Sequence, residues 1–210
     1  MIKYPKLMKT YCLLIFISFF VNIYGQEKFK IKVEEGPNWK SMYYIINEKG
    51  EIIKQLDSTK YIISFNRDNY ESFAVFAIKG ERGWSAIDIN EKKLFEVYNT
   101  SFGEPTPDQI VENKIRIVDE NNKIGFADNK GKIIIKPQFE IATTFHKGKA
   151  IIGKGCEKIL WDEHAKEEDC QHFSIVCKKH GYINEKGKEI TLGNFTFEEI
   201  QKKIKWKAPE

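Results

Sequence analysis

Ile124–Ile151 reads Ile-Gly-Phe-Ala-Asp-Asn-Lys-Gly-Lys-Ile-Ile-Ile-Lys-Pro-Gln-Phe-Glu-Ile-Ala-Thr-Thr-Phe-His-Lys-Gly-Lys-Ala-Ile, and this segment is the one from which the architecture of the chain is inferred. Two segments rich in β-branched and aromatic residues flank a polar turn that contains Gly131. A corner with Pro137 and Phe139 follows, and then a second turn marked by Gly148. Short β-rich segments separated by such turns are typical of strands joined as hairpins.

Fainter copies of the first turn occur elsewhere in the chain, which predicts a tandem repeat. The aligned Asp or Asn residues of the four copies are Asn47, Asp88, Asp128 and Asn184, separated by 41, 40 and 56 positions. An Asp or Asn followed three residues later by Gly is typical of hairpin loops, because the side chain bonds the backbone ahead and Gly accepts positive φ. Asp88 is followed instead by Glu91, which predicts a weaker or differently shaped turn.

We therefore expect an all-β fold of tandem antiparallel β-hairpin repeats, arranged as a meander or solenoid, in a single domain over residues 26–210. One short C-terminal α-helix is predicted over 196–206. Thr196 and Glu199 fit a capping box, and Phe195 and Ile200 fit a hydrophobic staple. The helix is expected to close the last open edge of the sheet, since an unprotected edge promotes aggregation.

Residues 1–25 have the pattern of a secretory signal peptide. Lys3, Lys6 and Lys9 precede the apolar run Tyr11–Val21, and Gly25 suits cleavage. The alternative is a membrane anchor, but the run is shorter than the roughly 20 residues that span a bilayer. We expect a secreted or periplasmic protein without a stable transmembrane segment after cleavage.

The net charge of +4 depends on these first residues. Without the three N-terminal lysines, 31 basic residues face 30 acidic ones. A chain so nearly neutral, with signs interspersed, lacks the basic surface of a nucleic-acid binder.

The segment Ile124–Ile151 combines Gly125, Phe126, Asp128, Gly131, Lys132, Ile135, Pro137, Phe139, Glu140, Ala142, Phe145, Gly148 and Ala150. With these residues the repeat resembles the WG-repeat (KWG-repeat) family, whose usual pattern begins Trp-Gly-aromatic-Ile-Asp. The departures are Ile124 and His180 at the Trp position of this pattern, and Ser85 after Trp84. The resemblance implies an all-β repeat scaffold, usually exported or surface-associated in bacteria, with no assigned catalytic residues. We expect no enzyme and no cofactor, but an unknown protein or cell-envelope partner. The residues that carry the repeat pattern are Gly50, Trp84, Asp88, Gly125, Asp128, Gly131, Pro137, Phe139, Gly148, Gly181, Asn184 and Gly187.

The last repeat carries an insertion, 156–177, with all the cysteines that remain after residue 25. A disulfide is the preferred interpretation, because an exported chain meets an oxidising compartment. Cys156–Cys177 is the favoured pair, since the two residues should flank the insertion on neighbouring strands, and Cys170 is left over. The alternative is a metal-binding or thiol-redox site formed by Cys170, His172, Cys177 and His180, although no Cys-x-x-Cys spacing supports zinc.

Weaker candidates are an aromatic ligand platform and an acidic cluster. The platform would use Trp84, Trp161 and Trp206, but tryptophans in strands belong more often to the core. The acidic residues of 162–169 lack the ordered spacing of a calcium loop, which favours a solvated loop. The loops 156–177 and 101–110 are the segments we expect the repeats to present to a partner.

Overall fold

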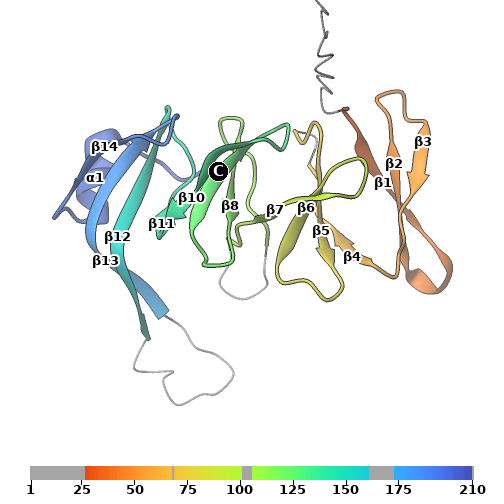
Figure 1. The fold of residues 1–210 in the computed structure, drawn as a ribbon, viewed down its shortest axis with the longest axis horizontal. Coiled ribbons are helices and arrows are strands. Elements are labelled where there is room, and N and C mark those ends of the chain that lie inside the picture. The colour runs from red at the N-terminus through yellow and green to blue at the C-terminus, as the bar shows by residue number, and fades with distance from the viewer. Residues whose placement is uncertain (1–26, 68, 101–105, 161–172, 210) are drawn as a thin grey trace, which may run out of the picture.

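The computed structural model describes residues 27–67, 69–100, 106–160 and 173–209. Their strands form three antiparallel sheets, which follow one another along the long axis of the molecule, with one α-helix at the C-terminal end (Figure 1). The predicted all-β fold of hairpin-linked strands is thus confirmed. No helix within the described ranges is long and apolar enough to cross a membrane.

The first sheet has three strands in the order β1-β2-β3, with a short 3₁₀ turn, η1 (Pro37–Trp39), between the first two. We call it the first repeat. Its strands are β1 (Lys30–Glu35), β2 (Ser41–Ile46) and β3 (Ile52–Gln55).

The second sheet is a seven-stranded meander in the order β10-β9-β8-β7-β6-β5-β4. It holds the second repeat, β4–β7, and the third repeat, β8–β10. The strands are β4 (Tyr61–Ser64), β5 (Ala74–Ile78), β6 (Trp84–Ile87), β7 (Lys93–Val97), β8 (Lys114–Val118), β9 (Ile124–Asp128) and β10 (Ile133–Phe139).

The third sheet is the fourth repeat, with the order β11-β12-β13-β14. Its strands are β11 (Ile141–Ala142), β12 (Lys149–Leu160), β13 (Phe173–Asn184) and β14 (Glu189–Gly193). β12 and β13 continue beyond their neighbours as a two-stranded ribbon that projects from the body (Figure 1). Both ends of the predicted insertion are therefore paired strand.

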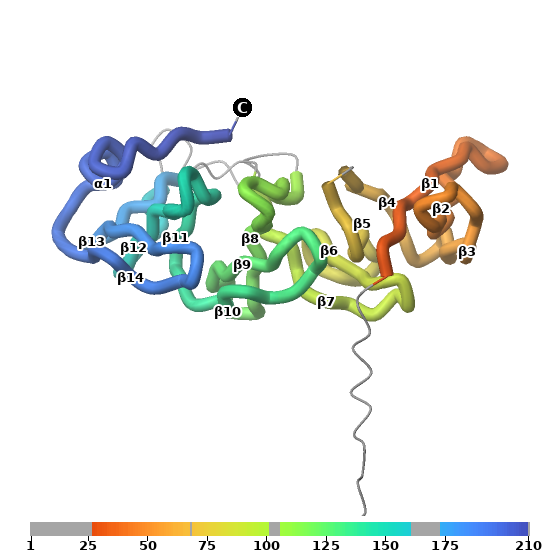
Figure 2. Tube along the Cα trace, turned by 90° about the horizontal axis from the view of Figure 1, so that it is seen from above, coloured from red at the N-terminus to blue at the C-terminus, as the bar shows by residue number. Residues whose placement is uncertain are grey.

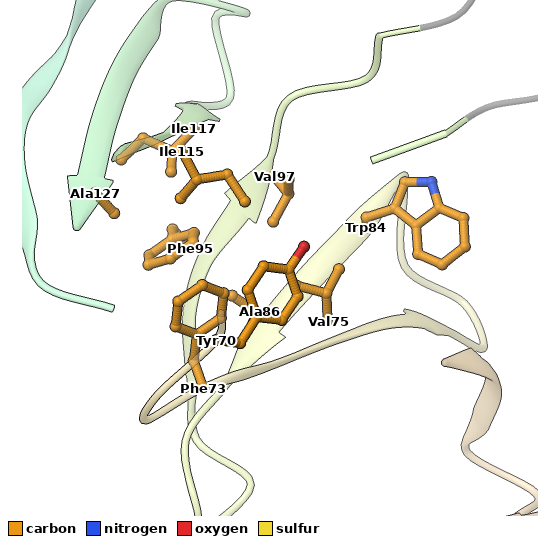
Figure 3. Packing of buried hydrophobic residues seen from close by; sticks show 10 residues of the cluster. All are labelled: Tyr70, Phe73, Val75, Trp84, Ala86, Phe95, Val97, Ile115, Ile117 and Ala127. Carbon is orange, nitrogen blue, oxygen red and sulfur yellow. The ribbon is translucent and has the colours of Figure 1, made fainter. Parts of the chain in front are cut away.

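Buried clusters join each repeat to the next, as in solenoids whose units bury their apolar faces only against neighbours. One cluster packs β2 of the first repeat against β5 and β6 of the second, through Ile45, Phe76 and Ile87. The next joins the second and third repeats, with residues from β5–β9 and, just before β5, Tyr70 and Phe73; Figure 3 shows its ten side chains. A third cluster joins the third and fourth repeats, around Phe126 and Ile183.

The C-terminal helix α1 (Phe197–Ile204) begins with the predicted capping box. Thr196 Oγ1 accepts a hydrogen bond from the backbone N–H of Glu199 at 3.1 Å, and the Glu199 carboxylate accepts one from the N–H of Thr196 at 2.8 Å. The helix ends where Lys205 adopts the left-handed conformation. Local sequence chemistry therefore sets both ends of this helix.

The predicted position of the helix at the sheet edge is wrong. Its buried residues Ile200 and Ile204 pack on Ile151 of β12, and the main neighbours of α1 are the inner strands β12 and β13. An amphipathic helix needs an apolar surface for its stripe, and the sheet face offers Ile151. After α1 the chain turns back over the fourth repeat toward the third (Figure 2).

Candidate binding pocket between the third and fourth repeats

The four predicted turns share one geometry. In the third repeat, Asp128 Oδ1 accepts hydrogen bonds from the backbone N–H groups of Lys130 at 3.0 Å and Lys132 at 2.9 Å. Asp88 Oδ1 accepts from the groups two and four residues on in the same way, both at 2.9 Å. The side chains of Asn47 and Asn184 do likewise. The expectation of a differently shaped turn at Asp88 is therefore wrong.

Glu91 makes the Asp88 turn possible without glycine. It adopts a left-handed φ of 63°, where the third repeat has Gly131 at 80°. Its carboxylate accepts a hydrogen bond from the Tyr61 hydroxyl at 2.8 Å and forms an ion pair with Lys54. These contacts offset the strain of a left-handed side chain.

A fifth turn of the same kind, between β8 and β9, was not predicted from the sequence. Asp119 Oδ1 accepts from the backbone N–H groups of Asn121 at 3.0 Å and Lys123 at 2.8 Å, and Asn122 has a φ of 58°. Asn is, after Gly, the residue most tolerant of this conformation. An Asp followed three residues later by Asn was the signal that could have revealed it.

The two glycines after the Trp position serve a close approach of backbones. A Cβ on Gly125 would lie 2.5 Å from the carbonyl oxygen of Ile135 and from the nitrogen of Pro137, where β10 is irregular. A Cβ on Gly181 would lie 1.8 Å from the carbonyl oxygen of Thr191. No side chain fits at either position without moving a strand.

The residues at the Trp position itself are all buried, at 2% exposure for Ile124, 7% for Trp84 and 9% for His180. Trp84 lies in the core beside Phe65, so it offers no ligand platform. Phe139 is also buried, and Gly148 takes a φ of 69° in the turn before β12. The repeat motif thus describes packing and turn geometry in this chain.

The structure joins Cys156 and Cys177 by a disulfide, the pairing that the sequence favoured. The two residues are direct partners on β12 and β13, and the ribbon continues beyond them to the pair Leu160 and Phe173. In this form Cys177 has no thiolate to offer a metal. Nδ1 of His180 lies 2.9 Å from the carbonyl oxygen of Phe195.

The other residues of the alternative metal site, Cys170 and His172, lie outside the described residues, as do Trp161 and the acidic residues of 162–169. Among the residues that the structure does describe, no group of three or more His, Cys, Asp or Glu side chains is placed to hold a metal ion.

A pocket of about 450 Å³ lies where the third repeat, the fourth repeat and the C-terminal tail meet. Its walls come from segments far apart in the chain: the approach to β8, the segment from β11 to Thr144, and the tail after α1. The lining residues are Thr100, Asp108, Gln109, Val111, Arg116, Ile141, Ala142, Thr143, Thr144, Trp206, Ala208 and Pro209.

Polar contacts across this junction hold the two repeats together. The Glu112 carboxylate, just before β8, accepts hydrogen bonds from the backbone N–H groups of Lys147 and Gly148 in the turn before β12. Lys114 Nζ lies 2.7 Å from the carboxylate of Glu185. These bonds fix the relative position of the pocket's walls.

An ion pair forms the polar end of the pocket. The Asp108 carboxylate accepts bonds from Nε of Arg116 at 3.0 Å and from its Nη2 at 2.7 Å, which is the bidentate geometry of strong pairs. Asp108 is 3% exposed. The Arg116 guanidinium also lies over the ring of Tyr98, 4.3 Å from its centroid. Asp108 belongs to the loop 101–110 that the sequence singled out, of which 101–105 lie outside the described residues.

Trp206 anchors the tail, which forms a further wall of the pocket. Its indole N–H donates to the carbonyl oxygen of Thr144 at 2.8 Å, and its ring packs edge-on against Phe197 of α1. Ala208 and Pro209 then line the pocket. Of the two proposed platform tryptophans that the structure describes, Trp84 is buried in the core and Trp206 lines this cavity.

The comparison with known families supports the repeat assignment. Residues 124–155 match the family model described as a WG containing repeat. This segment begins at β9, runs through β10 and β11, and ends within β12. A search of curated proteins found no match. The chain therefore contains a segment similar to WG-containing repeats, and it is the segment that spans the junction bearing the pocket.

Proposed function

We propose that this protein is an exported, non-catalytic repeat scaffold that binds a protein or cell-envelope partner at the junction of its third and fourth repeats. The observation that carries the proposal is the junction pocket, because concave, mostly apolar sites with a few placed polar groups are the usual form of binding sites. The similarity of residues 124–155 to WG-containing repeats supports a scaffold role.

Export rests on the first 25 residues and is consistent with the disulfide. The test is the intact mass of the protein recovered outside the cytoplasm, measured natively and after denaturation with thiol alkylation. A chain that starts near Gln26, lacks two hydrogens and carries one alkylatable cysteine supports export with Cys156–Cys177 formed. A chain that still starts at Met1 contradicts cleavage. A native mass raised by one zinc ion, with three free thiols, supports the metal-binding alternative instead.

Partner binding is tested with two matched substitutions. Gln109 is an exposed residue of the pocket wall, and Gln138 is an exposed residue of β10 outside the pocket lining. Gln109→Trp fills the pocket, whereas Gln138→Trp adds the same side chain elsewhere. Each protein is immobilised and exposed to an envelope extract. A partner retained by the wild type and by Gln138→Trp but lost with Gln109→Trp supports the proposal. A partner retained equally by all three contradicts binding at the pocket.

A further inference from the structure

The two charged side chains that line the pocket, Asp108 and Arg116, form an ion pair with each other. Besides its two bonds to the Arg116 side chain, the Asp108 carboxylate accepts the backbone N–H of Arg116 at 2.9 Å. The Arg116 side chain is 14% exposed and Asp108 is 4% exposed at its side chain. A charged ligand group that displaced one partner of this buried pair would leave the other uncompensated, which is strongly unfavourable.

Several neutral polar groups around the pocket also have hydrogen-bond partners, whereas Thr144 Oγ1 has none among the described residues. The carbonyl oxygen of Ala142 accepts Nη1 of Arg116 at 3.1 Å, and the carbonyl oxygen of Thr144 accepts the Trp206 indole N–H. Thr143 Oγ1 donates to Thr144 O at 3.0 Å and accepts the N–H of Ile151 at 2.9 Å. A saccharide, which presents a hydroxyl at nearly every carbon, would compete with these bonds.

Apolar surface makes up most of the rest of the lining. The apolar lining residues are Val111, Ile141, Ala142, Trp206, Ala208 and Pro209. The volume of about 450 Å³ is within the range of roughly 300–1,000 Å³ that is typical of ligand pockets. Protein interfaces gain most of their affinity from a few anchor side chains that fill well-packed, desolvated pockets.

Resting on the function proposed above, we infer that the junction pocket takes an uncharged apolar anchor of a partner polypeptide: an aromatic or branched aliphatic side chain on an extended segment. The anchor fills the space between Trp206 and Ile141. The ion pair between Asp108 and Arg116 remains intact when the anchor is bound. The pocket therefore selects against acidic and basic anchors, and partner specificity comes from the exclusion of charge.

A titration with short peptides tests this inference on the purified, disulfide-bonded protein labelled with ¹⁵N. The probes are acetyl-Gly-X-Gly-amide with X as Trp, Leu, Asp or Lys, and maltose as a saccharide. The readout is the amide spectrum, with the Trp206 indole signal assigned by Trp206→Phe. With Trp and Leu we expect shifts at Gln109, Ala142, Thr144 and the Trp206 indole, and dissociation constants on the order of 1 mM, because a single anchor gives weak binding. Gln109→Trp should weaken this binding about tenfold, and Gln138→Trp should leave it unchanged.

Three results overturn the inference: shifts at the pocket with the Asp or Lys peptide or with maltose but not with the apolar peptides, shifts confined to other surfaces, or no shift with any probe. The outcome is separable from that of the proposed function. Apolar peptides that bind while the captured partner ignores Gln109→Trp would preserve the inference and refute partner binding at this junction. A partner lost with Gln109→Trp but mimicked only by maltose would do the reverse.

Discussion

The second and third repeats build the same turn on different strands. The third keeps Gly125 and Pro137, and its β10 crosses so close to β9 that a Cβ at Gly125 would meet backbone at 2.5 Å. The second has Ser85, whose side chain is fully buried and donates to the Glu81 carboxylate at 2.7 Å. The turn and the close strand crossing are therefore separate parts of the motif, and only the crossing demands glycine.

The largest expected effect is at this crossing. Gly125→Ala should lower the free energy of unfolding by about 3 kcal/mol, because the added carbon can be accommodated only by moving the backbone of β10. Ser85→Ala, the equivalent change in the second repeat, removes one hydrogen bond and should cost about 1 kcal/mol. Urea unfolding of both variants measures the difference. Equal losses would show that the two strand pairs do not differ as described.

The turns themselves should respond equally. Asp128→Ala and Asp88→Ala each remove an acceptor of two backbone N–H groups and should each cost about 1.5 kcal/mol. Asp128→Asn should cost about 0.5 kcal/mol or less, since Asn caps backbone N–H groups as well as Asp does, and Asn47 and Asn184 have this role in the other repeats. A loss at Asp88 much smaller than at Asp128, by the same urea assay, would mean that the second turn is weaker after all.

Sequence reasoning succeeded where the chemistry is local. The capping box at Thr196 and the turns at Asn47, Asp128 and Asn184 depend on residues within four positions of one another, so a short pattern contains the whole interaction. It failed at Glu91, because the side chains that support a left-handed glutamate, Tyr61 and Lys54, are distant in sequence.

The pocket could not have been predicted for the same reason. Its walls are assembled from the segment before β8, the segment after β11 and the C-terminal tail, and nothing local connects Asp108 with Trp206. The position of α1 could not be predicted either, because it depends on contacts of Ile200 and Ile204 with Ile151, which is distant in sequence. The disulfide could be predicted because Cys156 and Cys177 flank an insertion between two predicted strands.

Acid should weaken the second repeat through Glu91. Burial alone raises the pKa of Glu91, but the bonds from Lys54 and Tyr61 outweigh burial and hold the pKa below its ordinary value of 4.5. A lowered folded-state pKa gives a stabilisation that is complete above the unfolded pKa and is lost as the pH falls through the folded one. When the pH falls from neutral to about 3, the free energy of unfolding of Glu91→Gln should therefore decrease by about 1 kcal/mol less than that of the wild type.

The control for this acid series is Glu48→Gln, which alters an exposed carboxylate of the first repeat's turn. It should retain the pH dependence of the wild type. Identical pH dependence in the wild type and Glu91→Gln would contradict the compensation ascribed to Glu91.

The smallest effect is expected where the third repeat meets the fourth. Thr144 Oγ1 is buried without a hydrogen-bond partner among the described residues, so Thr144→Val should be neutral or stabilise by up to about 1 kcal/mol. Thr143→Val is the matched change, and it should cost about 1 kcal/mol because Thr143 Oγ1 makes two hydrogen bonds. Thermal unfolding compares them, and a loss at Thr144 as large as at Thr143 would show that its hydroxyl is bonded.

Amide hydrogen exchange of the purified, disulfide-bonded protein shows most directly whether the repeats share one turn regardless of how well each matches the motif. We expect slow exchange at Asn90 and Lys92 of the second repeat, as at Lys130 and Lys132 of the third, because all four N–H groups donate to an aspartate side chain. Fast exchange at Asn90 and Lys92, with protection kept at Lys130 and Lys132, would contradict it and limit the shared turn to the segment that matches the family.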